Sequence, residues 1–151
     1  MNEIKRGIIT EKGTISLKEL ISSIKNNPNF KEAGDIIIFS GVVRETSLKS
    51  PKKVIGIEIE AYDEVAEQQL EKICEKMIEE RELIDVRICH YTGTFSVGET
   101  LIHCLIASKH RKEGIEALPK IIEEYKKALI WKKEIYLDNT YQWISENKPK
   151  F

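Results

Sequence analysis

The chain has 151 residues, of which 41% are hydrophobic and 32% charged, and its formal net charge is −1. This composition supplies enough apolar material for one packed core and excludes a disordered chain, while the near-zero charge disfavours a general nucleic-acid binder. No apolar run approaches the roughly 20 residues of a membrane span, and the N-terminal residues lack the apolar stretch of a signal peptide. We therefore expect a cytoplasmic protein without membrane or nucleic-acid partners.

The first part of the chain predicts a strand and a helix. Residues 4–10 are expected to form an opening strand or an extended arm. The segment from Ser16 to Glu19 has the form of a capping box, in which the serine hydroxyl accepts from the Glu19 amide and a helix begins. Apolar residues then recur at helical spacing until the Asn-Asn-Pro-Asn segment at 26–29 ends the helix.

Two strands joined by a polar loop are predicted next. Residues 34–44 are rich in β-branched side chains and predict a buried strand, in which Gly41 indicates a bulge or a close backbone approach. Residues 45–53 are polar and contain a proline, which is typical of a surface loop. Residues 54–62 alternate isoleucine with glutamate and predict a half-exposed strand.

The following residues predict a helix and another pair of strands. Asp63 is expected to be the N-cap of a helix that runs to about residue 82 with one apolar face. Residues 84–91 and 99–108 are expected to be strands, separated by a turn at 92–98.

A third helix and two closing strands complete the predicted order. The helix is expected to begin near His110 and end near Lys127, with a kink or a restart at Pro119. Short strands are expected at 129–137 and 141–144. Strands and helices in this order predict an α+β domain with largely antiparallel pairing.

Basic side chains gather in the C-terminal half. Between Lys109 and Lys133 there are seven lysines and one arginine but only four glutamates, which suggests a local anionic ligand or an anionic partner tail. His110 and Arg111 follow an apolar strand and begin a helix, where unsatisfied amides attract anions. Arg44 ends a strand before a loop and could reach a ligand. The alternative for His110 and Arg111 is an ordinary solvated helix start, and the sequence alone favours it. The alternative for Arg44 is the solvated end of a strand.

Four lysines flank the end of the third predicted helix. Lys126 and Lys127 lie at its C-terminus, where cations commonly complement the helix dipole. Lys132 and Lys133 follow Trp131, which is more often a packing anchor than a ligand platform. Alternatively, two of these lysines converge on one pocket, where neighbouring cations and partial burial would lower a lysine pKa.

Neither a metal nor a cofactor is expected. Cys89 and His90, like His103 and Cys104, are neighbours in predicted strands, and neighbouring strand residues point to opposite faces. The three cysteines, which include Cys74, form an odd set without CxxC spacing and are expected to be reduced and mostly buried. No phosphate loop, dinucleotide fingerprint or GxSxG motif is present.

Three segments together resemble the large, catalytic subunit of molybdopterin synthase. They are GDIIIFSGVVR from residue 34, YTGTFSVGETLIHCLIASKHR from residue 91 and EYKKALIWKKE from residue 124. The specific part is the SKHR segment followed by a helix and WKKE. The resemblance covers about residues 34–144 and implies one domain over 1–151 that resembles the α/β-hammerhead fold with an additional antiparallel β portion.

The resemblance implies an activity and partners. Enzymes of this family are sulfurtransferases that convert cyclic pyranopterin monophosphate into the dithiolene of molybdopterin. Sulfur arrives on the thiocarboxylated C-terminal Gly-Gly tail of a small ubiquitin-like subunit, which inserts into a pocket of the large subunit. Two large subunits form the central homodimer of a heterotetramer.

Site residues are implied position by position. Arg44, His110 and Arg111 would bind the anionic substrate, and Lys126 and Lys132 would be catalytic and also contact substrate. Lys133 and Glu134 would line the same region and also bind substrate.

The sequence departs from the family pattern at two places. Val42 stands where the family has a lysine, and the segment between the two pocket lysines is one residue shorter, so that Lys127 is the alternative to Lys126. Two other functions therefore remain open: a non-catalytic homologue that binds the partner, and an unrelated anion- or RNA-binding α+β domain.

Overall fold

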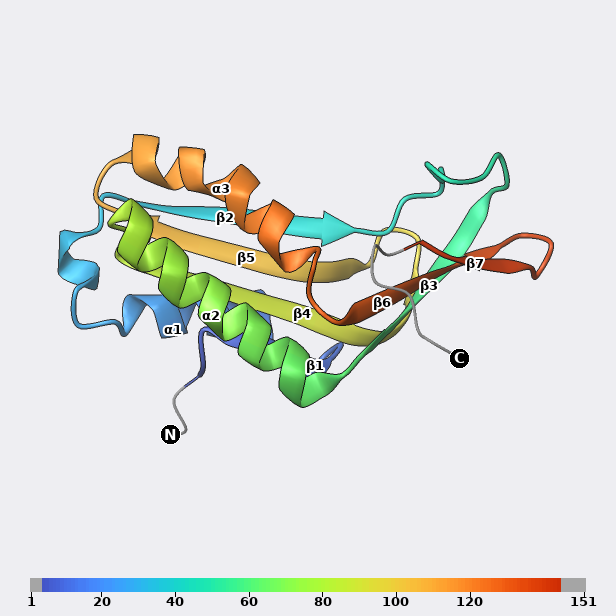
Figure 1. Cartoon of the computed structure of the whole chain (residues 1–151), viewed down its shortest axis with the longest axis horizontal. Helices are drawn as coiled ribbons and strands as arrows, with labels where there is room; N and C mark the ends of the chain where they lie inside the picture. The colour runs from blue at the N-terminus through green and yellow to red at the C-terminus, as the bar shows by residue number, and fades with distance from the viewer. Residues whose placement is uncertain (1–3, 145–151) are drawn as a thin grey trace.

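The computed structural model describes residues 4–144, which form one continuous sheet with helices on both faces (Figure 1). In chain order the elements are β1 (Gly7–Glu11), α1 (Leu17–Lys25), the short 3-10 helix η1 (Phe30–Glu32), β2 (Asp35–Val42), β3 (Val54–Ala61), α2 (Asp63–Arg81), β4 (Asp85–Ser96), β5 (Thr100–Ser108), α3 (Arg111–Tyr125), β6 (Ile130–Tyr136) and β7 (Tyr141–Trp143). The predicted order of strands and helices is confirmed, and so is the α+β class.

Strand β4 joins the two portions of the sheet. One of its edges pairs with β5, and its other edge pairs first with β1 and then with β3. The strand order is β2-β5-β4-β3-β6-β7, with β1 beside β4. Every pairing between named strands is antiparallel except that of β1 with β4.

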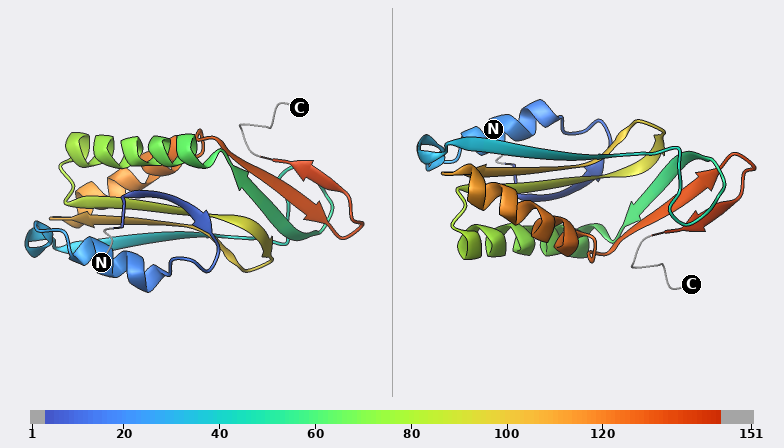
Figure 2. Two further views of the ribbon diagram at one scale, coloured as in Figure 1. Left: turned by 90° about the horizontal axis from the view of Figure 1, so that it is seen from below. Right: turned by 90° about the horizontal axis from the view of Figure 1, so that it is seen from above.

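Helices α2 and α3 cover one face of the sheet and α1 lies on the other, while β3, β6 and β7 extend beyond the helices at one end (Figure 2). Helix α2 packs closely on β1, because Gly7 has no side chain: a Cβ there would lie 2.3 Å from the Glu71 nitrogen. The glutamates of α2 accept from the edge of β1 that does not pair with β4: the Gly7 amide donates to Glu71 at 2.7 Å and the Ile9 amide to Glu67 at 3.1 Å. No helix among residues 4–144 is long and apolar enough to cross a membrane.

Local capping and bulge predictions are confirmed at two positions. The Ser16 hydroxyl accepts from the Glu19 amide at 3.1 Å, and α1 begins at the next residue. The pairing of β2 with β5 shifts register between Gly41 and Val42. A Cβ on Gly41 would lie 2.9 Å from a methyl carbon of Ile102, so the glycine also permits a close approach.

Other local predictions are wrong. Strand β2 is not fully buried, because it is the edge strand next to β5, and Ile38 is 41% exposed. Residues 92–96, predicted as a turn, continue β4 because they pair with β3. Asp63 is the first residue of α2 and not its N-cap.

Of the two alternatives predicted at Pro119, the restart is wrong, and the kink stays a prediction. Helix α3 runs through this proline without interruption. The residue lies on the exposed face of the helix, and the carbonyl that loses its amide partner belongs to Ile115, which is 56% exposed. Water can therefore take the place of the missing hydrogen bond.

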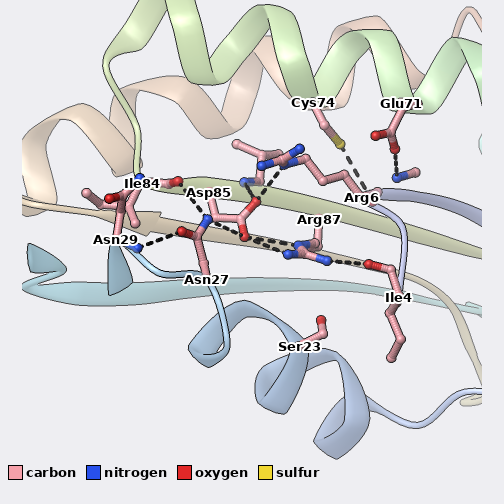
Figure 3. A network of polar contacts seen from close by, with 12 residues as sticks. Ile4, Arg6, Ser23, Asn27, Asn29, Glu71, Cys74, Ile84, Asp85 and Arg87 are labelled. Atoms are coloured by element: carbon pink, nitrogen blue, oxygen red, sulfur yellow. Dashed lines mark hydrogen bonds and ion pairs between the residues drawn. The ribbon is translucent and has the colours of Figure 1, made fainter. Parts of the chain in front are cut away.

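A buried carboxylate fastens the beginning of β4 to distant parts of the chain (Figure 3). Asp85 is completely buried and accepts from Arg6 Nε at 3.1 Å, from Asn27 Nδ2 at 3.1 Å and from Arg87 Nη2 at 2.9 Å. Arg87 in turn donates to the carbonyl of Ile4 at 2.7 Å. One carboxylate thus joins β4, the arm before β1 and the corner after α1.

The network predicts a large loss of stability on removal of its charge. In Asp85→Asn the guanidinium groups of Arg6 and Arg87 lose their buried counterion, and the unfolding free energy should fall by about 3 kcal/mol or more in a urea titration. Asp138→Asn is the control, because its ion pair with Lys52 lies at the surface and should change stability little. Equal effects of the two substitutions would contradict this account of the network.

Candidate functional site

A cleft of about 610 Å³ opens where the end of β2, the end of α3 and strand β6 meet. Its walls also include parts of the 45–53 loop and residues of β3, β4 and β5. Much of the lining is apolar. The charged or titratable side chains that line it, apart from the phenol of Tyr125, are those of Arg44, Lys49, His90, Lys126, Lys132 and Glu134.

The alternation of strand β6 decides which of its residues reach the cleft. Lys132 and Glu134 line it, and the residue between them faces away. That residue, Lys133, forms an ion pair with Glu58 at 3.2 Å and lies over the rings of Tyr141 and Trp143. Lys133 was predicted in the same region as Lys132, but in this chain it is on the opposite face of the sheet.

The structure distinguishes the two candidates at the end of α3. Both lysines are exposed, but Lys126, the C-cap residue, lines the cleft and Lys127 does not. Arg44 reaches the same cleft from the end of β2. The structure therefore brings together Arg44, Lys126 and Lys132, and the geometry favours Lys126 over its neighbour.

Lys132 has an unusual environment for an amine. Its pKa is lowered from 10.5 to about 8. Burial is the larger cause, and the positive charge of Lys126 is the smaller one. A lysine of this kind exchanges its proton near neutral pH, which an ordinary surface lysine does not do.

Glu134 links the wall of the cleft to the loop above it. Its side chain is buried, and Oε1 accepts from the hydroxyl of Ser47 at 2.6 Å and from that of Tyr136 at 2.9 Å. The same Ser47 oxygen accepts from the amides of Lys49 and Ser50. Glu134 thus orders the loop that carries Lys49 into the cleft.

His110 and Arg111 lie elsewhere. They belong to a second cleft, of about 510 Å³, which is formed with Gly34, Asp35 and neighbouring lysines. Helix α3 separates this cleft from Lys126, and its 15 residues span about 20 Å. Within one chain, therefore, the structure does not bring His110 and Arg111 to the lysines with which they were grouped.

A larger cavity, of about 1310 Å³, lies between α1 and the ends of α2 and β4. Its rim carries charges of both signs, and two of its arginines, Arg6 and Arg87, bind Asp85. No convergent set of one charge is present there, so the lysine cleft is the better candidate site.

His90 was considered in the sequence only as a metal ligand, yet it lines the lysine cleft. Nothing in its sequence context separates it from an ordinary core residue, since it lies within an apolar strand. Over residues 4–144 no group of three or more His, Cys, Asp or Glu side chains is arranged to hold a metal ion. The three cysteines are buried, and burial raises the pKa of Cys89 and that of Cys104 to about 12.

The pKa of Lys132 predicts a pH-dependent difference in stability. Between about pH 8 and 10.5 the unfolded chain binds more protons at this lysine than the folded chain, so its contribution to the unfolding free energy increases with pH. Lys132→Met should be more stable than the wild type at pH 7, and the difference should shrink as the pH rises through this window in urea titrations. A constant difference between Lys132→Met and the wild type across this window would contradict the prediction.

Comparison with known proteins identifies the family. A family model described as MoaE protein matches residues 10–128. The molybdopterin synthase catalytic subunit of Pyrococcus abyssi is 30% identical over 149 residues, which cover 98% of this chain and 96% of that protein. The corresponding subunit of Bacillus subtilis is 35% identical over 136 residues, covering 89% and 82%.

Solved structures share the fold. The crystal structure of molybdopterin synthase from Staphylococcus aureus matches with a TM-score of 0.80 and 26% identity, covering 95% of this chain and 99% of that chain. A chain from the complex of subunits 1 and 2 of the molybdopterin-converting factor of Helicobacter pylori matches with a TM-score of 0.68 and 22% identity, covering 93% and 90%. With the MoaE match over most of its length and relatives at this level of identity, the chain belongs to the MoaE family of molybdopterin synthase catalytic subunits.

Proposed function

We propose that this chain transfers sulfur from the thiocarboxylated C-terminus of a small ubiquitin-like subunit to cyclic pyranopterin monophosphate, which yields the dithiolene of molybdopterin. The observation that carries the proposal is the convergence of Arg44, Lys126 and Lys132 on one partly apolar cleft in a chain of this family. Substrate phosphate and the thiocarboxylate are both anions, and this cleft is lined by four cations and one carboxylate.

The residues of the cleft have distinct roles in this proposal. A dithiolene holds two sulfur atoms, so two thiocarboxylated tails react in turn. Each sulfur forms a bond to a substrate carbon in place of a carbon–oxygen bond, whose oxygen leaves on the phosphate or as water. Water then hydrolyses the acyl–sulfur bond, which leaves the sulfur on the substrate and returns the partner tail as a carboxylate. Arg44 binds an anionic group of the substrate, and Lys126 acts as acid, base or transient covalent partner. Lys132 stabilises developing negative charge or orients the substrate. The buried cysteines have no role, because the nucleophilic sulfur belongs to the partner.

The lining of the cleft suits the end of a partner tail. Gly41 and Val42 both line it, and neither brings a charged side chain into it. The structure of the Helicobacter pylori complex, whose chain shares this fold, supports a small-subunit partner in this family. A tail ending in Gly-Gly suits such a site because it has no side chains to accommodate.

His110 and Arg111 require a second copy of the chain in this proposal. About 20 Å of helix separates them from Lys126 in one chain, so they reach the substrate only from a neighbouring subunit. The edge strand β2 exposes apolar side chains, with Ile38 41% and Val42 51% exposed, which favours contact with another chain. We infer a homodimer at the centre of a cytoplasmic heterotetramer.

The shortened segment between the lysines raised the alternative of a non-catalytic homologue. Against it, Lys126 and Lys132 both line the cleft despite the missing residue, and Lys132 has the lowered pKa expected of a working amine. A partner-binding module without turnover would not need this environment.

A reconstituted assay tests the activity. Purified protein, thiocarboxylated partner and cyclic pyranopterin monophosphate are mixed, and the dithiolene product is measured as its fluorescent oxidation derivative. Lys126→Ala and Lys132→Ala should each lose about a hundredfold or more in rate, and Lys127→Ala should keep wild-type activity. Absence of product with wild type despite stable partner binding would favour the non-catalytic homologue.

Mixing inactive variants tests the shared site. Arg111→Ala and Lys132→Ala homodimers should each be nearly inactive. After exchange of subunits, a mixed dimer carries one intact site, in which the cleft of one chain meets Arg111 of the other, so activity should return to about a quarter of the wild-type value. Failure to recover any activity, although exchange is shown by mass spectrometry, would place Arg111 outside the substrate site.

A further inference from the structure

Lys49 is the cation of the lysine cleft to which the proposed reaction assigns no role. It lines the cleft together with Arg44, Lys126 and Lys132. Those three follow β2, cap the end of α3 or belong to β6, whereas Lys49 comes from the loop between β2 and β3. An ammonium group donates three hydrogen bonds and accepts none, so a cation that lines a ligand cleft favours an anionic group on the ligand.

The three lysines of this loop differ in what they contact. Lys52 forms an ion pair with Asp138 at 2.8 Å, and Lys53 forms one with Glu45 at 3.4 Å. Neither of these two lysines lines the cleft, and in the described part of the chain Lys49 forms no such pair with a carboxylate. Lys49 is therefore the lysine of the loop that a ligand in the cleft can contact.

A serine hydroxyl fixes the backbone at Lys49. Ser47 Oγ donates to Glu134 Oε1 at 2.6 Å and accepts from the amides of Lys49 at 3.0 Å and Ser50 at 3.1 Å. One donor and two acceptor sites are the whole capacity of a hydroxyl group. Glu134 is itself fixed, because it is 6% exposed and also accepts from the hydroxyl of Tyr136 at 2.9 Å. The side chain of Lys49 is exposed but its backbone is anchored, which reduces the ordering cost when it binds a ligand.

We propose that Lys49 binds the phosphate group of the pterin substrate, and that Ser47 is the positioning residue that holds Lys49 at the cleft. The identity of this ligand rests on the proposed function. A cyclic phosphate keeps unesterified oxygens, which the guanidinium fork of Arg44 and the ammonium group of Lys49 can share.

Exposure favours the phosphate over the partner tail as the ligand of Lys49. Arg44 and Lys49 both line the cleft and are both exposed, so they lie toward its opening, whereas Lys132 is less exposed. The phosphate is the most strongly hydrated part of the substrate, and it loses least hydration when it binds near the opening. The end of the tail must instead reach the reacting carbon, which the proposed reaction places beside Lys132.

A matched set of substitutions isolates the charge of Lys49. Lys49→Met removes the ammonium group and keeps an unbranched side chain, and Lys49→Arg keeps the charge. Lys53→Met is the control, since it removes a lysine of the same loop that does not line the cleft. The affinity of each full chain for cyclic pyranopterin monophosphate is measured by titration calorimetry without the partner, so that no turnover occurs.

Lys49→Met should bind the substrate about tenfold more weakly than the wild type, the size expected for one lost hydrogen bond between charged groups. Lys49→Arg and Lys53→Met should bind it with nearly wild-type affinity. Because Lys49 is exposed, its substitution should not impair folding. An unchanged affinity in Lys49→Met would overturn the proposal, since a lysine that is only solvated would give this result.

Two further ligands identify the group that Lys49 contacts. The same pterin without its phosphate should bind equally to the wild type and to Lys49→Met. An equal loss of affinity for both pterins would overturn the proposal, because the contact would then not be with the phosphate. A weakened affinity for the thiocarboxylated partner, with unchanged affinity for the substrate, would assign Lys49 to the tail and would overturn it as well.

A double-mutant cycle tests the positioning role of Ser47. Ser47→Ala should weaken substrate binding several-fold, and Ser47→Thr, which keeps a hydroxyl, should restore it. Glu134 keeps the hydroxyl of Tyr136 in both variants. In the Lys49→Met background Ser47→Ala should change the affinity no further, since the hydroxyl acts through Lys49. Additive losses would overturn the positioning role.

These affinities separate the inference from the proposed reaction. Substrate binding that depends on Lys49, without dithiolene formation when the partner is added, would contradict the sulfur transfer and support the binding role. Dithiolene formation by the wild type, with substrate affinity that does not depend on Lys49, would support the sulfur transfer and overturn the binding role.

Discussion

The fold depends on strand β4, whose backbone hydrogen bonds are shared among three neighbouring strands. One edge of β4 binds β5, and the other binds β1 over residues 88–92 and β3 over residues 93–96. This change of partner connects the helix-covered part of the sheet to the β3, β6 and β7 part that projects from it (Figure 1). The lysine cleft lies close to the junction, because His90 lines it and lies three residues before Gly93, where the pairing with β3 begins.

The two ends of β4 serve different purposes. At its beginning Asp85 takes up the donors of Arg6, Asn27 and Arg87, so a buried charge is fully paired and anchors the chain. Toward the cleft, His90 is buried and neutral, and Lys132 retains an amine of lowered pKa. The beginning of β4 thus holds a fully paired charge, whereas the proposed chemistry lies where a cation is partly desolvated beside other cations.

Much of the site could be predicted because it depends on local patterns. Arg44 follows the end of β2 and Lys126 is the C-cap of α3, so both lie at element boundaries that the sequence predicts. The family resemblance grouped Arg44, Lys126 and Lys132, and all three line one cleft. It could not show that His110 is separated from them by the length of α3, since distance along a helix becomes distance in space only when both ends are placed.

The sequence by itself determined the order and type of the elements, because periods of two and 3.6 residues and the Ser16 cap act within a few residues of the chain. Only the tertiary structure decided that β2 is an edge strand, that β4 continues through residues 92–96 and that His90 belongs to the lysine cleft. Each of these features depends on which strand, distant in sequence, pairs with or packs against the segment. The local sequence of a segment does not specify that partner.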